Sequence, residues 1–258
     1  MLINDNFLNV NLFKETKKDT TLIFTHGLGE YSKSYEETAK YFNELGFYVI
    51  TYDIRGHGKS EGERGSIGSF KLFLDDLNEL VNFAYKNTNK VFLVGHSMGG
   101  VITNLYTSIN NNVDGVIITA SPTTYLKDFR LLKYFPRFLL NNRKFPTNFN
   151  DPKLMHHNNY VIDSFDIKYF RFKLINEVLF KGMNQLINNY HNFETNILLI
   201  YSLKDELAPV YYGELFYNEI NSEDKELYIL NESFHNVFVD IEKKKVWEKI
   251  LKWVNERI

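Results

Sequence analysis

A serine placed between glycines at the end of an apolar run is the strongest constraint in this sequence. Residues 91–100 read VFLVGHSMGG, so the apolar run is followed by Gly95, His96, Ser97, Met98, Gly99 and Gly100. Glycine-rich punctuation after a strand often marks an ordinary turn. Alternatively, the G-x-S-x-G spacing places Ser97 on a turn so sharp that only glycine fits on either side of an exposed hydroxyl. The pentapeptide alone leaves both interpretations open.

Short β-rich runs alternate with longer helical patterns along the chain. This alternation predicts an α/β fold with a mainly parallel sheet wrapped by helices. The expected strands are residues 7–13, 21–25, 48–53, 91–94, 116–119, 197–201 and 227–230. The expected helices are residues 35–45, 70–85, 98–109, 210–219 and 241–258. The last helix has the clearest helical spacing, with one apolar stripe formed by Trp247, Leu251, Val254 and Ile258.

Composition narrows the class of protein. At 258 residues with 44% hydrophobic residues, the chain fits a single domain over residues 1–258. A formal net charge of -2 gives no basic field that would favour a nucleic-acid partner. The absence of cysteine excludes a disulfide scaffold, a thiolate nucleophile and Cys-ligated zinc. The first residues lack a leader pattern and no apolar run reaches about 18 residues, so we expect a soluble, cytoplasmic protein.

Residues 122–193 interrupt the alternation of strands and helices. They contain no convincing strand and are too long for a plain connection, so we expect an inserted helical cap. The first half of this segment combines Leu and Phe with one acid, Asp128, and six basic residues: Lys127, Arg130, Lys133, Arg137, Arg143 and Lys144. Two interpretations fit this composition. The basic side chains are either a solvated helix face or part of an apolar lid that makes peripheral contact with anionic lipid.

An acid and a histidine follow Ser97 in positions that suit nucleophilic catalysis. Asp205 lies four residues past Tyr201, after the buried run NILLIY, and His235 lies five residues past Leu230, after LYIL. Both fall where a strand ends, at the sheet edge where Ser97 also emerges. A Ser-His-Asp arrangement at that edge would activate the serine hydroxyl. Taken singly, Asp205 could also cap a helix and His235 could be a turn residue.

Other candidate groups are weaker. The adjacent pair His156 and His157 cannot face one way on a regular element, and neither HExxH nor another zinc spacing is present. We therefore expect no metal and no cofactor. Asp240 is the nearest rival acid to His235, but it lies at the expected start of the last helix, where capping is its commoner role. The stretch TYDIRGHGKSEGERGS is glycine-rich, but it lacks the ending of a phosphate-binding P-loop.

Five stretches together carry a family resemblance: HGLGEYS, DIRGHGKSEGERG, GHSMGG, LKDELAP and SFHN. They resemble the monoacylglycerol lipase and lysophospholipase branch of the α/β-hydrolases, among the serine aminopeptidase S33-like hydrolases. The resemblance implies an eight-stranded, mostly parallel sheet with a cap inserted after Ala120. One departure is Ser202, which stands where relatives commonly have glycine.

The same resemblance implies the roles of five residues. It assigns Ser97 as nucleophile, His235 as general base and Asp205 as the acid that orients the base. The backbone N–H groups of Leu28 and Met98 would form the oxyanion hole, with His26 tying that loop down.

The expected reaction is hydrolysis of a carboxylic ester, most simply a lipid with a single acyl chain such as a monoacylglycerol or lysophospholipid. A short-chain carboxylesterase, a thioesterase or an amidase would use the same residues, so the motifs leave these alternatives open. A different class is an inactive ligand-binding homologue, but such proteins usually lose a triad member. The expected partner is a small ester or lipid substrate.

Overall fold

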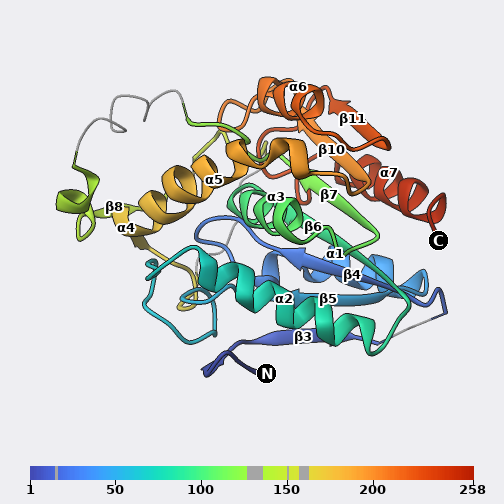
Figure 1. The fold of residues 1–258 in the computed structure, drawn as a ribbon, viewed down its shortest axis with the longest axis horizontal. Coiled ribbons are helices and arrows are strands. Elements are labelled where there is room, and N and C mark those ends of the chain that lie inside the picture. Colours follow the sequence, from blue (N-terminus) through green and yellow to red (C-terminus); the bar gives the residue numbers. More distant parts are fainter. Residues whose placement is uncertain (15–16, 127–135, 150, 157–162) are drawn as a thin grey trace.

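A seven-stranded sheet organises the computed structural model, which describes residues 1–14, 17–126, 136–149, 151–156 and 163–258. The strand order is β11-β10-β7-β6-β4-β5-β3, and only β3 runs antiparallel to its neighbour (Figure 1). The strands are β3 (Val10–Phe13), β4 (Thr20–Thr25), β5 (Tyr48–Tyr52), β6 (Lys90–His96), β7 (Gly115–Thr119), β10 (Ile197–Ser202) and β11 (Lys225–Leu230). The expected mostly parallel α/β fold is confirmed.

The expected count of eight strands is wrong for the sheet formed by the described residues. The run expected as one strand over residues 7–13 is divided, and only Val10–Phe13 joins the sheet. Before it, β1 (Leu2–Ile3) and β2 (Asn6–Phe7) form a separate antiparallel hairpin. Asn4 and Asp5 both have positive φ, 48° and 59°, which suits a two-residue hairpin turn. This tight turn folds the chain back on itself before it reaches the sheet edge.

Helices cover both faces of the sheet (Figure 1). On one face lie α1 (Glu36–Glu44) and α7 (Lys243–Asn255), and on the other lie α2 (Lys71–Tyr85), α3 (Met98–Asn110) and α6 (Val210–Glu219). Successive residues of the central strands serve opposite faces: Phe24 packs in the cluster with α1 and α7, and Ile23 packs in the cluster with α2 and α3. Burial on both sides explains why these strands are continuous apolar runs.

The apolar stripe predicted for the last helix is partly wrong. The helix ends at Asn255, so Ile258 leaves the helical register and is 45% exposed. The buried residues of α7 are Val246, Trp247, Ile250, Trp253 and Val254. The Trp253 ring lies 5.9 Å from the Phe92 ring, edge to face, against the middle of the sheet. A broader face than the single predicted stripe is therefore buried.

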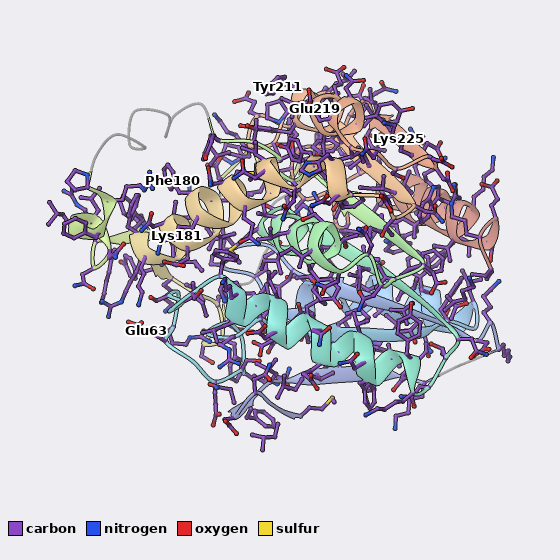
Figure 2. The ribbon with its side chains drawn as sticks, in the orientation of Figure 1. Glu63, Phe180, Lys181, Tyr211, Glu219 and Lys225 are labelled. Atoms are coloured by element: carbon purple, nitrogen blue, oxygen red, sulfur yellow. The ribbon has the colours of Figure 1, made fainter. Side chains whose placement is uncertain are left out.

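The segment expected as a cap lies between β7 and β10. Its described part contains a long helix made of α4 (Phe172–Ile175), a π-helical segment (Asn176–Gly182) and α5 (Met183–Asn188). Figure 2 labels Phe180 and Lys181 on this helix. The expectation that the segment has no strand is wrong, because β8 (Lys144–Pro146) pairs antiparallel with β9 (Tyr169–Arg171). Strands of three residues are too short to show an alternating pattern.

Some of the predicted basic residues of the cap, Lys127, Arg130 and Lys133, lie outside the described residues. His157 lies outside them as well. Within the part of the chain that the structure describes, no helix combines the length and apolarity needed to cross a bilayer.

Candidate active site

Ser97 stands on a strained turn between β6 and α3. Its backbone has φ 51° and ψ -120°, a region that residues other than glycine rarely occupy. A Cβ on Gly95 would lie 2.6 Å from Thr103 Oγ1, and a Cβ on Gly99 would lie 2.2 Å from the Thr25 carbonyl oxygen. The two glycines therefore let α3 start against β4 and β6. The turn is the sharp strand-to-helix bend, not an ordinary loop turn.

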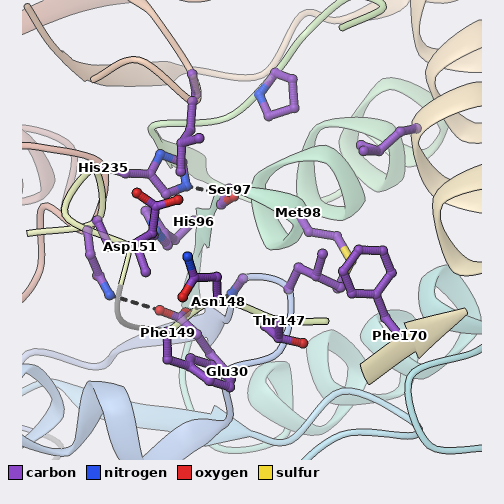
Figure 3. A pocket seen from close by; sticks show the side chains of 18 of the residues that line it. Glu30, His96, Ser97, Met98, Thr147, Asn148, Phe149, Asp151, Phe170 and His235 are labelled. Atoms are coloured by element: carbon purple, nitrogen blue, oxygen red, sulfur yellow. Dashed lines mark hydrogen bonds between the residues drawn. The ribbon is translucent and has the colours of Figure 1, made fainter. Parts of the chain in front are cut away.

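The structure brings Ser97, His235 and Asp205 together. His235 Nε2 lies 3.0 Å from Ser97 Oγ, and His235 Nδ1 lies 2.8 Å from Asp205 Oδ2. Figure 3 shows the first of these contacts at the edge of the pocket. The three residues follow β6, β11 and β10, so they meet because parallel strands end at one edge of the sheet. This chain of contacts can pass a proton from the serine hydroxyl to the imidazole.

Asp205 also holds its own loop. Its Oδ1 accepts hydrogen bonds from the Leu207 and Ala208 N–H groups at 2.8 and 2.9 Å, while Oδ2 faces His235. The following helix, α6, begins after Pro209, so Asp205 does not cap it. One oxygen fixes the turn and the other fixes the imidazole.

A pocket of about 330 Å³ opens beside Ser97 (Figure 3). Leu28 and Met98, the two predicted oxyanion-hole residues, line it together with Ser97 and His235. Its apolar lining comes largely from the predicted cap and includes Leu126, Phe149, Met155, Phe170, Ile175 and Leu179. Its polar lining includes Glu30, Asn148, Asp151 and Asn236. A mostly apolar pocket with a few polar groups at the reactive end is typical of a small-molecule site.

Comparison with known proteins decides the family. The model described as Serine aminopeptidase, S33 matches residues 16–242. The chain belongs to this family. It is an α/β-hydrolase, and the resemblance carried by the five sequence stretches is confirmed.

The relatives differ in how much of their length is matched. An abhydrolase domain-containing protein of Dictyostelium discoideum is 28% identical over 264 residues, covering 95% of this chain and 27% of that protein. The monoglyceride lipase of Rattus norvegicus is 40% identical over 100 residues, covering 38% of this chain and 33% of that enzyme. The chain therefore matches about a third or less of the length of these two relatives.

The solved structure of Paleococcus ferrophilus monoacylglycerol lipase has a TM-score of 0.85 to this chain. The match is 23% identical and covers 98% of this chain and 100% of that chain. At this identity the likeness establishes the fold.

The charges of Asp205 and His235 stabilise each other. Burial alone would raise the pKa of Asp205, but the charge of His235 and the hydrogen bonds to the carboxylate outweigh burial and hold the pKa below its usual value. Burial alone would lower the pKa of His235, but the Asp205 charge and hydrogen bond outweigh it and raise the pKa above 6.5, with Glu30 adding to the rise. The imidazole is thus a stronger base than a free one.

Two other histidines near the site stay neutral. Burial lowers the pKa of His96 to about 3 and that of His26 to about 4. His26 Nε2 accepts a hydrogen bond from the Ile54 N–H at 2.9 Å, so this side chain ties the loop after β4 to the loop after β5, as the resemblance implies. Among the described residues, no group of three or more His, Asp or Glu side chains could hold a metal ion.

Glu30 is a site residue that the sequence analysis did not identify. Its carboxylate accepts hydrogen bonds from the Gly27 N–H at 3.0 Å and the Tyr35 hydroxyl at 3.1 Å. It also accepts one from Asn236 Nδ2 at 2.9 Å, the dashed line beside Glu30 in Figure 3. It thereby links the loop that carries Leu28 to the residue after His235. Burial raises the pKa of Glu30, and these hydrogen bonds offset part of the rise. The one feature of the sequence that could have identified Glu30 is its position as an acid inside the stretch HGLGEYS.

Asp240 does not have the capping role expected for it. Helix α7 begins at Lys243, and the Asp240 side chain instead accepts a hydrogen bond from the Phe234 N–H at 2.7 Å. It also contacts His156, with Oδ2 at 3.1 Å from Nδ1. Ser202, which stands where relatives commonly have glycine, also has a structural role, because its hydroxyl donates to the Ser233 carbonyl oxygen. Both side chains support the loop that contains His235.

Replacing Gly99 by alanine tests the close contact at the turn. We expect Gly99→Ala to lower the free energy of unfolding by about 3 kcal/mol or more, because the new Cβ meets backbone that cannot move aside. The control is Gly68→Ala, whose Cβ would have Leu72 Cδ1 as its nearest neighbour at 3.8 Å. Urea unfolding of both variants measures the difference, and equal stabilities would contradict the packing described above.

The pH dependence of ester hydrolysis tests the pairing of His235 with Asp205. Only the neutral imidazole can accept a proton, so the rate falls as pH drops through the pKa of His235. Because this pKa is raised, we expect the limb of kcat/KM to lie above pH 6.5. In Asp205→Asn the limb should move to lower pH and kcat should fall by several orders of magnitude. A limb that stays in place in Asp205→Asn would contradict the pairing.

Proposed function

We propose that this hydrolase cleaves carboxylic esters, with Ser97 as nucleophile, His235 as general base and Asp205 as the acid that orients it. The observation that carries the proposal is the continuous path from Asp205 Oδ2 through His235 to Ser97 Oγ, at 2.8 and 3.0 Å, beside an apolar pocket. Membership of the S33 family supports it.

The reaction has two halves. His235 takes the proton of Ser97 as its oxygen attacks the ester carbonyl, and the alcohol leaves with that proton, giving an acyl-enzyme. Water then attacks the acyl-enzyme with His235 again as base, the bond between the acyl carbon and Ser97 Oγ breaks, and the carboxylic acid leaves as His235 returns the proton to Ser97. The Leu28 and Met98 N–H groups hold the negative oxygen, and each such donor contributes about 3 kcal/mol to the transition state. The start of α3 adds its positive end at the same place.

A single acyl chain is the substrate that the pocket supports best. Most of its lining residues are apolar, and each buried CH₂ contributes roughly 0.8 kcal/mol. The name of the rat relative, monoglyceride lipase, agrees with this substrate class. A short-chain carboxylesterase or a thioesterase is the second candidate, because it needs the same three residues.

A chain-length series separates the two candidates. For monoacylglycerols we expect kcat/KM to rise by up to about fourfold per added CH₂ until the pocket is full. Lysophospholipids and p-nitrophenyl esters in the same assay compare head groups. Ser97→Ala should lower kcat by several orders of magnitude with every substrate. Rates that are highest for acetyl esters would favour the short-chain carboxylesterase, and a normal rate in Ser97→Ala would overturn the nucleophile assignment.

We also propose that the tip of the predicted cap makes peripheral contact with anionic lipid. Phe138 and Leu139 are 69% and 64% exposed, and Arg143 and Lys144 beside them are exposed too. Arg137 is not part of this surface, because its guanidinium packs over the Phe180 ring at 4.6 Å. Apolar and basic side chains together suit a headgroup surface.

Flotation with vesicles that contain phosphatidylserine tests this contact. Neutralising Arg143 and Lys144 by glutamine should weaken binding by about 2 kcal/mol, or roughly 30-fold, at low salt. The matched control makes the same change at Lys244 and Lys252 of α7, which lies at the opposite end of the molecule from β8 (Figure 1). No binding by the unaltered protein, or equal losses in both variants, would contradict the proposal.

A further inference from the structure

His235 lies on the loop between β11 and α7, and this loop contains no helix or strand. Three consecutive backbone N–H groups of this loop are bound, one by a side chain further along the loop and two by another segment. Phe234 donates to Asp240 Oδ2 at 2.7 Å, His235 donates to the Lys153 carbonyl oxygen at 3.2 Å, and Asn236 donates to the Leu154 carbonyl oxygen at 2.8 Å. The position of the imidazole therefore depends on these partners.

Two of the three partners belong to residues 151–156, which we call the strap. The strap lies within the predicted cap and forms a turn, in which Asp151 accepts hydrogen bonds from the Lys153 and Leu154 N–H groups. Asp151, Leu154 and Met155 line the pocket beside Ser97. A segment that lines the pocket is thus also the segment that holds the backbone of His235.

His156 fixes the end of the strap to the same loop. Its backbone N–H lies 3.0 Å from Asp240 Oδ1, and its ring Nδ1 lies 3.1 Å from Asp240 Oδ2. Its ring also stacks on Phe234, with centroids 4.2 Å apart and planes 16° apart. The Asp240 side chain is only 1% exposed, so its two oxygens are shared between the strap and the His235 loop. Asp240 therefore connects the strap to the loop of His235.

A second attachment reaches the loop of Asp205. Lys153 Nζ lies 2.7 Å from Glu206 Oε2, next to Asp205 in the chain. Both side chains are about half exposed or more, at 49% and 67%, so this ion pair contributes little. The buried contact through His156 and Asp240 is the stronger of the two.

We propose that the strap is a positioning element for the general base, and that His156 acts through Asp240 to hold the His235 imidazole in line with Ser97. The proposal rests on the proposed function, since it concerns the geometry of that reaction. His156 touches no reacting atom and is a positioning residue. A substrate in contact with Leu154 or Met155 would stabilise the strap. Occupation of the pocket would thereby be coupled to the position of the His235 imidazole.

Two substitutions at His156 separate positioning from packing. His156→Phe keeps a ring to stack on Phe234 but loses the Nδ1 contact with Asp240. His156→Asn loses the ring but places an amide N–H close to where Nδ1 lies. We expect kcat to fall by about tenfold or more in His156→Phe with KM almost unchanged, and to stay within about threefold of normal in His156→Asn. His191→Ala, at an exposed histidine outside the pocket lining, is the control and should keep its activity.

Nitrogen NMR of the histidine-labelled protein tests the strap without any substrate. The Nδ1–H signal of His235, which reports its hydrogen bond to Asp205, should shift and broaden in His156→Phe and stay unchanged in His156→Asn and His191→Ala. If His156→Phe does not fold, Asp240→Asn should produce the same change in the signal. An unchanged signal with unchanged kcat, or a rise in KM alone, would overturn the proposal. An unaltered protein that cleaves no ester would overturn the proposed function instead, and the NMR comparison would still decide the role of the strap.

Discussion

The contact between the start of α3 and the end of β4 is the constraint on which the candidate active site depends. Gly99 meets the Thr25 carbonyl so closely that only a hydrogen atom fits, and Ser97 adopts a positive φ at the bend. Such strain persists only where the surroundings determine the backbone fully. Here the Ser97 N–H bonds to the Thr119 carbonyl oxygen at 3.0 Å, and its own carbonyl accepts from Gly100 at 3.0 Å. The central strands therefore hold the serine.

The imidazole is supported in a different way. His235 lies on an irregular loop that is held by side chains. Ser202 and Glu30, from distant segments, bond to Ser233 and Asn236, and Asp240, further along the same loop, bonds to Phe234. Ser97 is thus placed by the sheet, whereas His235 is placed by loops. This difference in support, strands for Ser97 and loop contacts for His235, is the physical basis of the strap proposal.

Much of the fold could be predicted because its signals are local. The helix over residues 210–219 matches α6, and strand ends gave the positions at which Ser97, Asp205 and His235 meet. The hairpin of β1 and β2 was not predicted, because strands of two residues carry no periodicity. The contact of Glu30 with Asn236 joins residues 206 apart in sequence, and that of His156 with Asp240 joins residues 84 apart. No local pattern encodes such pairs.

Mapping a fluorophosphonate adduct by peptide mass spectrometry is the most direct test that Ser97 is an activated nucleophile. We expect one adduct per chain, on Ser97, formed about 10³-fold faster in the unaltered protein than in His235→Ala. Both proteins should be shown to be folded by circular dichroism before labelling. An adduct on another serine such as Ser121, or equal labelling rates in the two proteins, would contradict the central claim.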